Sequence, residues 1–218
     1  MTTDKKTDTA IQDENLFLKK QITQISGRLE DKIAELSAIK EIGSALKDIH
    51  NFGQTCQTIL DIVIKNTLAQ NFSIMLLDED RNRLFLVAAS DPDHKSFVEK
   101  TSNIFNKKNL DYSFRHGHGI AGQVLRDKKA ILVEDITKSP LFVSEVSTKV
   151  SIGSMFSMPL FVRDKTIGIL NLSHAQSHIF HPSDIRLFNI LADFISLLLF
   201  TSLESEKLLY SEQKYRAL

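Results

Sequence analysis

The 218-residue sequence is poor in residues that cross-link or break a chain, with one cysteine, four prolines and eight glycines. The single cysteine, Cys56, excludes an internal disulfide and a cysteine-ligated zinc ribbon, and it fits a reducing compartment. An excess of one charge is also missing, because 27 Lys+Arg balance 27 Asp+Glu. This balance excludes a strongly basic nucleic-acid binder and an acidic tail protein, so we expect no nucleic-acid partner.

Long hydrophobic runs are absent too. The longest apolar stretch, residues 195–200, is far shorter than the roughly 20 residues that a membrane-spanning helix needs. The first 14 residues are polar with mixed charge, unlike a signal or transit peptide. We therefore expect a cytoplasmic chain with no membrane span, and its 42% of hydrophobic residues is typical of a globular domain.

Residues 13–49 contain no proline and carry a heptad pattern. Apolar residues recur in steps of 3, 4 or 7 at Leu18, Ile22, Ile25, Leu29, Leu36, Ile39 and Leu46. The pattern predicts a helix that would be about 55 Å long at about 1.5 Å per residue. A helix longer than the diameter of a small domain must project from it, and its apolar seam then needs a partner to cover it. We therefore predict a parallel homodimer with Ile22, Ile25, Leu29 and Leu36 in its interface. The alternative is a long helix that lies on its own domain.

The pattern changes after a second predicted helix over residues 53–69, whose apolar stripe includes Cys56 as a core thiol. Short apolar runs then predict strands at 72–77, 84–89, 112–114, 130–133, 154–162 and 166–174. The glycine-rich stretch 116–125 predicts a loop that leads into a short helix. Antiparallel strands with helices before and after them indicate an α+β domain.

A last helix is predicted after residues 181–184. It is apolar on nearly every side between Ile190 and Phe200. Such a helix must bury two faces, one on its own sheet and one elsewhere. We therefore also place Leu191, Phe194 and Leu198 in the predicted homodimer interface.

The order of these motifs resembles a GAF domain of a bacterial-type signal transduction protein. The matching segments are FSIMLLDEDRNRLFLVAAS, GHGIAGQVLRDKKAILVEDI, SPLF, SMFSMPLFVRDKTIGILNLSH and FHPSDIRLFNILADFIS. The last eight residues, SEQKYRAL, resemble the start of a PAS domain. The chain would then divide into a disordered leader (1–12), an N-terminal coiled-coil helix (13–34), the GAF domain (35–205) and a C-terminal signalling helix or start of a PAS-like domain (206–218).

The resemblance implies a GAF-like antiparallel sheet flanked by helices, with long coiled-coil-forming helices at both ends and a small-molecule pocket on one face. It predicts a regulatory or sensory domain that binds a small molecule, mediates homodimerisation or does both. The signal would pass through the helices to a PAS, histidine kinase, diguanylate cyclase or similar domain outside this chain. The alternatives are a structural dimerisation spacer with no ligand, and a cyclic-nucleotide- or haem-binding sensor.

The resemblance also implies positions for the pocket. Related cyclic-nucleotide GAF domains place contacts at positions that match Ser73, Ile120, Ala121 and Asn171. Met75 shares a strand face with Ser73, because side chains alternate along a strand. Sequence proximity and parity add Phe114, Ser154 and Phe156.

Several more specific chemistries fit this sequence poorly. The motif of cyclic-nucleotide GAF domains matches at Phe180 and Asp184 but not at Ser173, His174 and Ile185. Bilin attachment needs a cysteine beside the pocket, and the free methionine sulfoxide reductase version of the fold needs several. We find no convergent set of nucleophile, base and orienting group, so we predict no enzymatic activity in this chain.

The sequence also contains a glycine-rich motif and two groups of histidines. The glycines at 117, 119 and 122 have dinucleotide-fingerprint spacing without the required strand-helix-strand context, so we expect them to shape a turn. Three histidines, His116, His118 and His174, are weak candidates for metal ligands. The stretch from His174 to His181 reads as a loop, so we expect neither a metal nor another cofactor.

Overall fold

The computed structural model describes residues 15–30, 32–33, 36–37, 40, 52–78, 82–90, 113–115, 117–142 and 151–216. The chain forms two compact units, Met1–Lys40 and Glu41–Leu218. All the described strands lie in the second unit, together with the helices that flank them. This unit confirms the predicted α+β class. The predicted leader at 1–12 lies outside the described residues.

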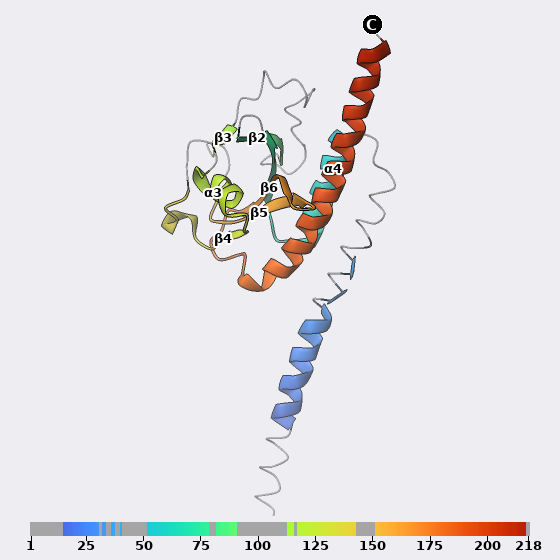
Figure 1. The fold of residues 1–218 in the computed structure, drawn as a ribbon. Helices are drawn as coiled ribbons and strands as arrows, with labels where there is room; N and C mark the ends of the chain where they lie inside the picture. Colours follow the sequence, from blue (N-terminus) through green and yellow to red (C-terminus); the bar gives the residue numbers. More distant parts are fainter. Residues whose placement is uncertain are drawn as a thin grey trace, which may run out of the picture. The chain divides into compact units, whose positions relative to one another are not determined.

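A six-stranded antiparallel sheet forms the centre of the second unit, with the strand order β3-β2-β1-β6-β5-β4. Its strands are β1 (Asn71–Asp78), β2 (Arg83–Ala89), β3 (Ser113–Arg115), β4 (Ile131–Val133), β5 (Ser154–Val162) and β6 (Lys165–His174). The helices are α2 (Phe52–Asn66), α3 (Gly119–Asp127) and α4 (Ile185–Arg216), with short 3₁₀ turns η2 (Ile136–Lys138) and η4 (Pro182–Asp184). Figure 1 shows α2 beside α4, with α3 near β4 and β5.

Helix α4 packs on one face of the sheet and against α2. The ring of Phe188 on α4 lies 4.7 Å from that of Phe156 on β5, and 5.8 Å from that of Phe180. All three phenylalanines are buried. Aromatic burial of this size contributes strongly to a core, so these rings fix the start of α4 on the sheet.

The apolar character of α4 has a structural cause. By length and hydropathy the stretch Pro182–Gln213 could cross a membrane, yet 44% of its apolar window is buried inside the domain. Leu191, Ile195, Leu198 and Leu199 are at most 1% exposed. Burial in the protein core accounts for the hydropathy of these positions.

The first unit is helical over residues 15–30. The predicted seam residues Ile22, Ile25, Leu29 and Leu36 are each about 60% exposed (63%, 62%, 59% and 63%). Their side chains are therefore available to a partner. The homodimer itself remains a prediction.

Candidate functional site

Three polar side chains of neighbouring strands form a row across the sheet. Asn171 on β6 pairs in register with Ser73 on β1 and with Ser157 on β5. Residues opposite one another in a ladder share a face. Ser157 is fully buried, Asn171 is 3% exposed and Ser73 is half-buried. We call these three residues the polar row.

Hydrogen bonds join the members of the polar row. The Ser157 hydroxyl donates to Asn171 Oδ1 at 2.6 Å, and Asn171 Nδ2 donates to Ser73 Oγ at 3.1 Å. Asn171 Nδ2 also lies 3.8 Å from the sulfur of Met75. A buried polar group without a partner costs about 1–3 kcal/mol, so these bonds make the row tolerable inside the domain. Ser73, at the half-buried end, carries a hydroxyl that can both donate and accept.

Helix α3 covers the face that carries the polar row. Its residues Ala121, Val124 and Leu125 form one apolar cluster with Met75 and Ile169, each two positions from a member of the row. Neighbouring Ile120 packs in a second cluster, with Val133 and Ile136. The row therefore lies at the junction between the sheet and α3.

Glycines shape the approach to α3, as the sequence predicts. Gly117 and Gly119 have positive φ angles of 76° and 69°, a conformation that favours glycine. A Cβ atom on Gly122 would lie 2.5 Å from the carbonyl oxygen of Arg115. The three glycines allow the first turn of α3 to approach β3 closely. This close approach explains the glycine spacing without a bound nucleotide.

The predicted pocket positions do not all meet in the structure. The structure brings together Ser73, Met75, Ala121 and Asn171 between the sheet and α3. Ile120 packs in the neighbouring cluster with Val133 and Ile136. Phe114 lies on β3, opposite Leu84 of β2, and its side chain lies outside what the structure describes.

The assignment of Ser154 and Phe156 to this pocket is wrong. Phe156 faces α4, where its ring contacts Phe188, and the Ser154 hydroxyl donates to the carbonyl of Gln176 at 2.8 Å. A β-bulge between Leu160 and Phe161 shifts the register by one residue. A one-residue shift moves every side chain to the other face, so Ser157 occupies the place expected for Phe156.

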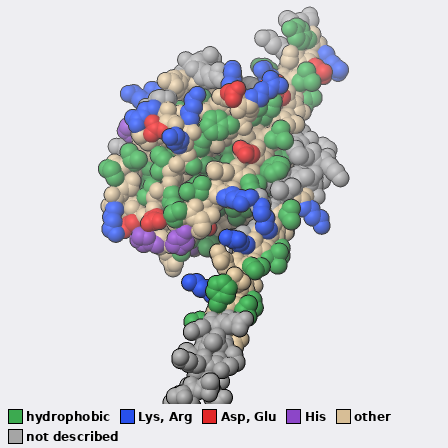
Figure 2. All heavy atoms as spheres, turned by 60° about the horizontal axis from the view of Figure 1, so that its bottom comes forward, with side chains coloured by type: hydrophobic (Ala, Val, Ile, Leu, Met, Phe, Trp, Pro, Cys, Tyr) green, Lys and Arg blue, Asp and Glu red, His purple; other side chains and the backbone are tan. Residues whose placement is uncertain are grey.

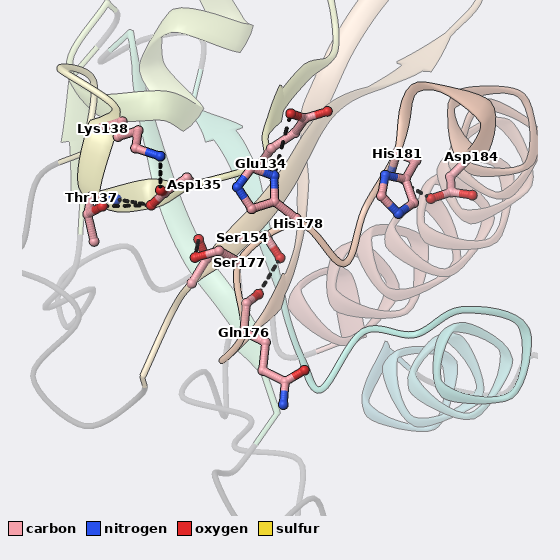
Figure 3. A network of polar contacts seen from close by, with 11 residues as sticks. Glu134, Asp135, Thr137, Lys138, Ser154, Gln176, Ser177, His178, His181 and Asp184 are labelled. Atoms are coloured by element: carbon pink, nitrogen blue, oxygen red, sulfur yellow. Dashed lines mark hydrogen bonds and ion pairs between the residues drawn. The ribbon is translucent and has the colours of Figure 1, made fainter.

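The loop after β6 is held by local contacts. Backbone N–H of His178 donates to the carbonyl of Glu134 at 2.6 Å, and its Nδ1 lies 3.7 Å from Glu134 Oε2. His174 Nδ1 accepts from the backbone of Gln176 at 3.0 Å. Figure 3 shows His178 beside Glu134, with His181 and Asp184 farther along the chain. Among the described residues no group of His, Cys, Asp or Glu could hold a metal ion. His118 is exposed, and His116 lies outside the described residues.

The two residues that match the cyclic-nucleotide motif have structural roles. Phe180 is 1% exposed and packs edge-on against Phe188. Asp184 accepts a hydrogen bond from the backbone N–H of His181 at 2.8 Å, which fixes the start of the final helical segment. Packing and capping therefore explain both matches.

One carboxylate near this loop has a strongly shifted pKa. Hydrogen bonds from Lys138 and from Thr137 lower the pKa of Asp135 to about 2. The Lys138 ammonium lies 2.8 Å from Asp135 Oδ2 (Figure 3). The ion pair joins the two ends of the short turn η2, and Asp135 stays ionised at neutral pH. We assign it a structural role, because it stabilises this turn.

The predicted dimer residues of α4 also need correction. Leu191 and Leu198 are each 1% exposed and belong to the core of their own domain, so their assignment to a dimer interface is wrong. Phe194 is half-buried. The exposed apolar residues of this part of α4 are Leu197 (44%) and Phe200 (38%). This helix is apolar on nearly every side, so its sequence could not show which side faces the sheet.

Comparison with known proteins places this fold in a family. A family model described as a GAF domain matches residues 50–199. The "Probable 3',5'-cyclic phosphodiesterase pde-5" of Caenorhabditis elegans is 26% identical over 166 residues, which cover 72% of this chain and 22% of the relative. The Nif-specific regulatory protein of Azospirillum brasilense is 24% identical over 170 residues, which cover 74% of this chain and 25% of the relative. The chain thus spans about a quarter of the length of these relatives.

Solved structures show the same fold. The GAF domain of a phosphoenolpyruvate-protein phosphotransferase from Coxiella burnetii has a TM-score of 0.65 at 15% identity, covering 80% of this chain and 98% of that one. The free methionine-R-sulfoxide reductase of Neisseria meningitidis has a TM-score of 0.58 at 15% identity, covering 77% and 89%. A GAF domain and an enzyme thus share this architecture, and the fold alone does not assign a role to this chain.

Proposed function

The chain belongs to the GAF domain family, a family of regulatory and sensory domains, and from this premise we propose that it binds a small molecule between the sheet and α3. Binding would alter the helices at the ends of the domain and so control an output domain, such as a histidine kinase or diguanylate cyclase, outside these 218 residues. The observation that carries this proposal is the polar row.

Burial of the polar row supports contact with a ligand. Burying polar groups is costly, and a sheet face that only packs against a helix is served by apolar residues. The row instead places an amide and two hydroxyls beside α3, and its outer hydroxyl, on Ser73, is half-buried. All three side chains are uncharged, so the part of the ligand that meets them would be a neutral hydrogen-bonding group.

The chain's one cysteine argues against the sulfoxide reductase activity of the structural relatives. Cys56 is fully buried on α2, and α2 packs against α4 rather than against α3. A dithiol mechanism needs a second cysteine, which these 218 residues lack. We therefore propose a binding role rather than a catalytic one.

A metabolite thermal-shift assay tests the proposal. A ligand present at 100 times its Kd stabilises the folded state by about 2.7 kcal/mol, which for a chain of this size raises Tm by roughly 5–10 °C. We expect Asn171→Leu to abolish this shift. Asn189→Leu, the same exchange at an exposed position of α4, is the matched control and should keep it. A library that includes cyclic nucleotides but shifts nothing, or a shift that survives in Asn171→Leu, would overturn the proposal.

A dimerisation spacer is the second candidate, favoured by the exposed apolar side chains on α4. Leu197 and Phe200 project from the domain surface, and Figure 2 shows further hydrophobic side chains on the projecting end of α4. Burying them in a second copy would remove this apolar area from water. Sedimentation equilibrium at micromolar concentration should return a dimer, and Leu197→Glu should weaken it more than Ser205→Glu on the same helix. A wild-type monomer would contradict this second proposal.

A further inference from the structure

A single hydrogen bond joins the start of α2 to α4. The backbone N–H of Phe52, the first residue of α2, donates to Glu206 Oε1 at 2.9 Å. The Phe52 side chain is fully buried, and Glu206 is half-buried. The two residues are 154 positions apart in the sequence.

Electrostatics favour this contact. The N-terminus of a helix carries a partial positive charge and has N–H groups without partners in the helix. The first turn of α2 contains no acidic residue, so Glu206 supplies from another helix the negative charge that α2 lacks. Glu204, two residues earlier, is exposed and instead lies 3.8 Å from Lys207.

The contact is located where the domain joins its flanking chain. Beyond Glu206, the next residues of α4 are exposed, from Lys207 to Tyr210, and Figure 1 shows α4 continuing past the sheet. Phe52 likewise begins α2, the first described helix of the second unit. The start of α2 and the last part of α4 are therefore tied at one point.

The part of α4 beside this contact holds a buried hydroxyl. Ser202, one turn before Glu206, is 1% exposed, and its hydroxyl has no hydrogen-bond partner among the described residues. A buried hydroxyl without a partner destabilises the packed arrangement. The hydrogen bond of Glu206 thus stabilises a part of α4 whose own packing includes an unfavourable buried group.

We propose that Glu206 is a positioning residue that couples the two connections of the domain. With the bond formed, the start of α2 and residues 203–216 of α4 move together; with the bond broken, they move independently. We name this pair, the Phe52 N–H and the Glu206 carboxylate, the latch. The inference requires neither a ligand nor a dimer, so it can fail or succeed separately from the proposed function.

Residue-resolved amide hydrogen exchange on the whole chain tests the latch. In Glu206→Ala we expect exchange at Phe52 and across residues 203–210 to accelerate about tenfold, the factor for losing one partly exposed hydrogen bond to a charged group. Exchange in β1, β5 and β6 should stay unchanged, which a general loss of stability would not allow. Glu204→Ala is the matched control and should alter neither region. Glu206→Gln keeps an oxygen acceptor and should restore at least half of the lost protection on a logarithmic scale.

Three results would overturn the latch. The first is equal exchange in Glu206→Ala and Glu204→Ala. The second is an acceleration by the same factor in the strands and in α4, which would reduce Glu206 to a general stabiliser. The third is a Glu206→Gln variant with no restored protection, which would exclude the hydrogen bond as the coupling element.

Discussion

A double-mutant cycle on Ser157 and Asn171 gives a quantitative test of the polar row. Ser157→Ala removes the donor that lies 2.6 Å from Asn171 Oδ1 and leaves that oxygen in a side chain only 3% exposed. Leaving a buried acceptor without a partner costs about 1–3 kcal/mol. Asn171→Leu leaves the fully buried Ser157 hydroxyl without its acceptor, at a similar cost of about 1–3 kcal/mol.

The double variant should be more stable than the sum of these losses predicts. Replacing both partners by apolar groups is nearly neutral for a buried pair, so we expect an interaction free energy of about 1–2 kcal/mol. Urea unfolding followed by circular dichroism measures all four states of the cycle. Ser205→Ala, on an exposed hydroxyl of α4, is the control and should change stability by less than about 0.5 kcal/mol. Additive losses at positions 157 and 171 would refute the hydrogen-bonded row.

Three further predictions follow from the packing and the charges. Phe156→Ala removes a fully buried ring beside Phe188 and should lower the free energy of unfolding by about 3–5 kcal/mol in urea; a loss below about 1 kcal/mol would mean that the ring does not face α4. Ser202→Ala removes a buried hydroxyl without a described partner and should raise the free energy of unfolding by about 1 kcal/mol, and Tm with it. A lower Tm would show that the Ser202 hydroxyl does make a stabilising hydrogen bond. Lys138→Ala should raise the pKa of Asp135 from about 2 toward the ordinary value of 3.8 in an NMR titration. The lowered pKa stabilises the fold above pH 3.8, and this gain is lost as the pH falls to about 2. An unchanged titration would show that Lys138 does not lower the pKa of Asp135.

Local patterns predicted most of the fold. Alternation and turn residues located the ends of β1, β2, β5 and β6 to within one residue. The apolar run near Ile195 predicted a helix buried on more than one side, and α4 is such a helix. The family resemblance then supplied the sheet and the face that carries Ser73 and Asn171.

The wrong predictions concern the register between strands and the packing of helices, which depend on tertiary contacts. Counting outward from the Val162–Lys165 pair at the turn would place Phe156 opposite Asn171, and the bulge at Leu160 replaces it with Ser157. The bulge lies beside Pro159 of β5 and Gly168 of β6. Proline and glycine inside strands often mark bulges, so these two residues are the local signal that could have revealed it. By contrast, the pattern of Leu191 and Leu198 could not distinguish a core from a dimer interface, because both bury apolar side chains.

Native mass spectrometry after incubation with a metabolite extract tests the central claim, that the domain binds a small molecule at the polar row. We expect the wild-type chain to carry an additional mass that is released on denaturation. Asn171→Leu should carry none, whereas the control Asn189→Leu should keep the bound mass. A bare chain mass for the wild type, or the same bound mass in wild type and Asn171→Leu, would contradict it.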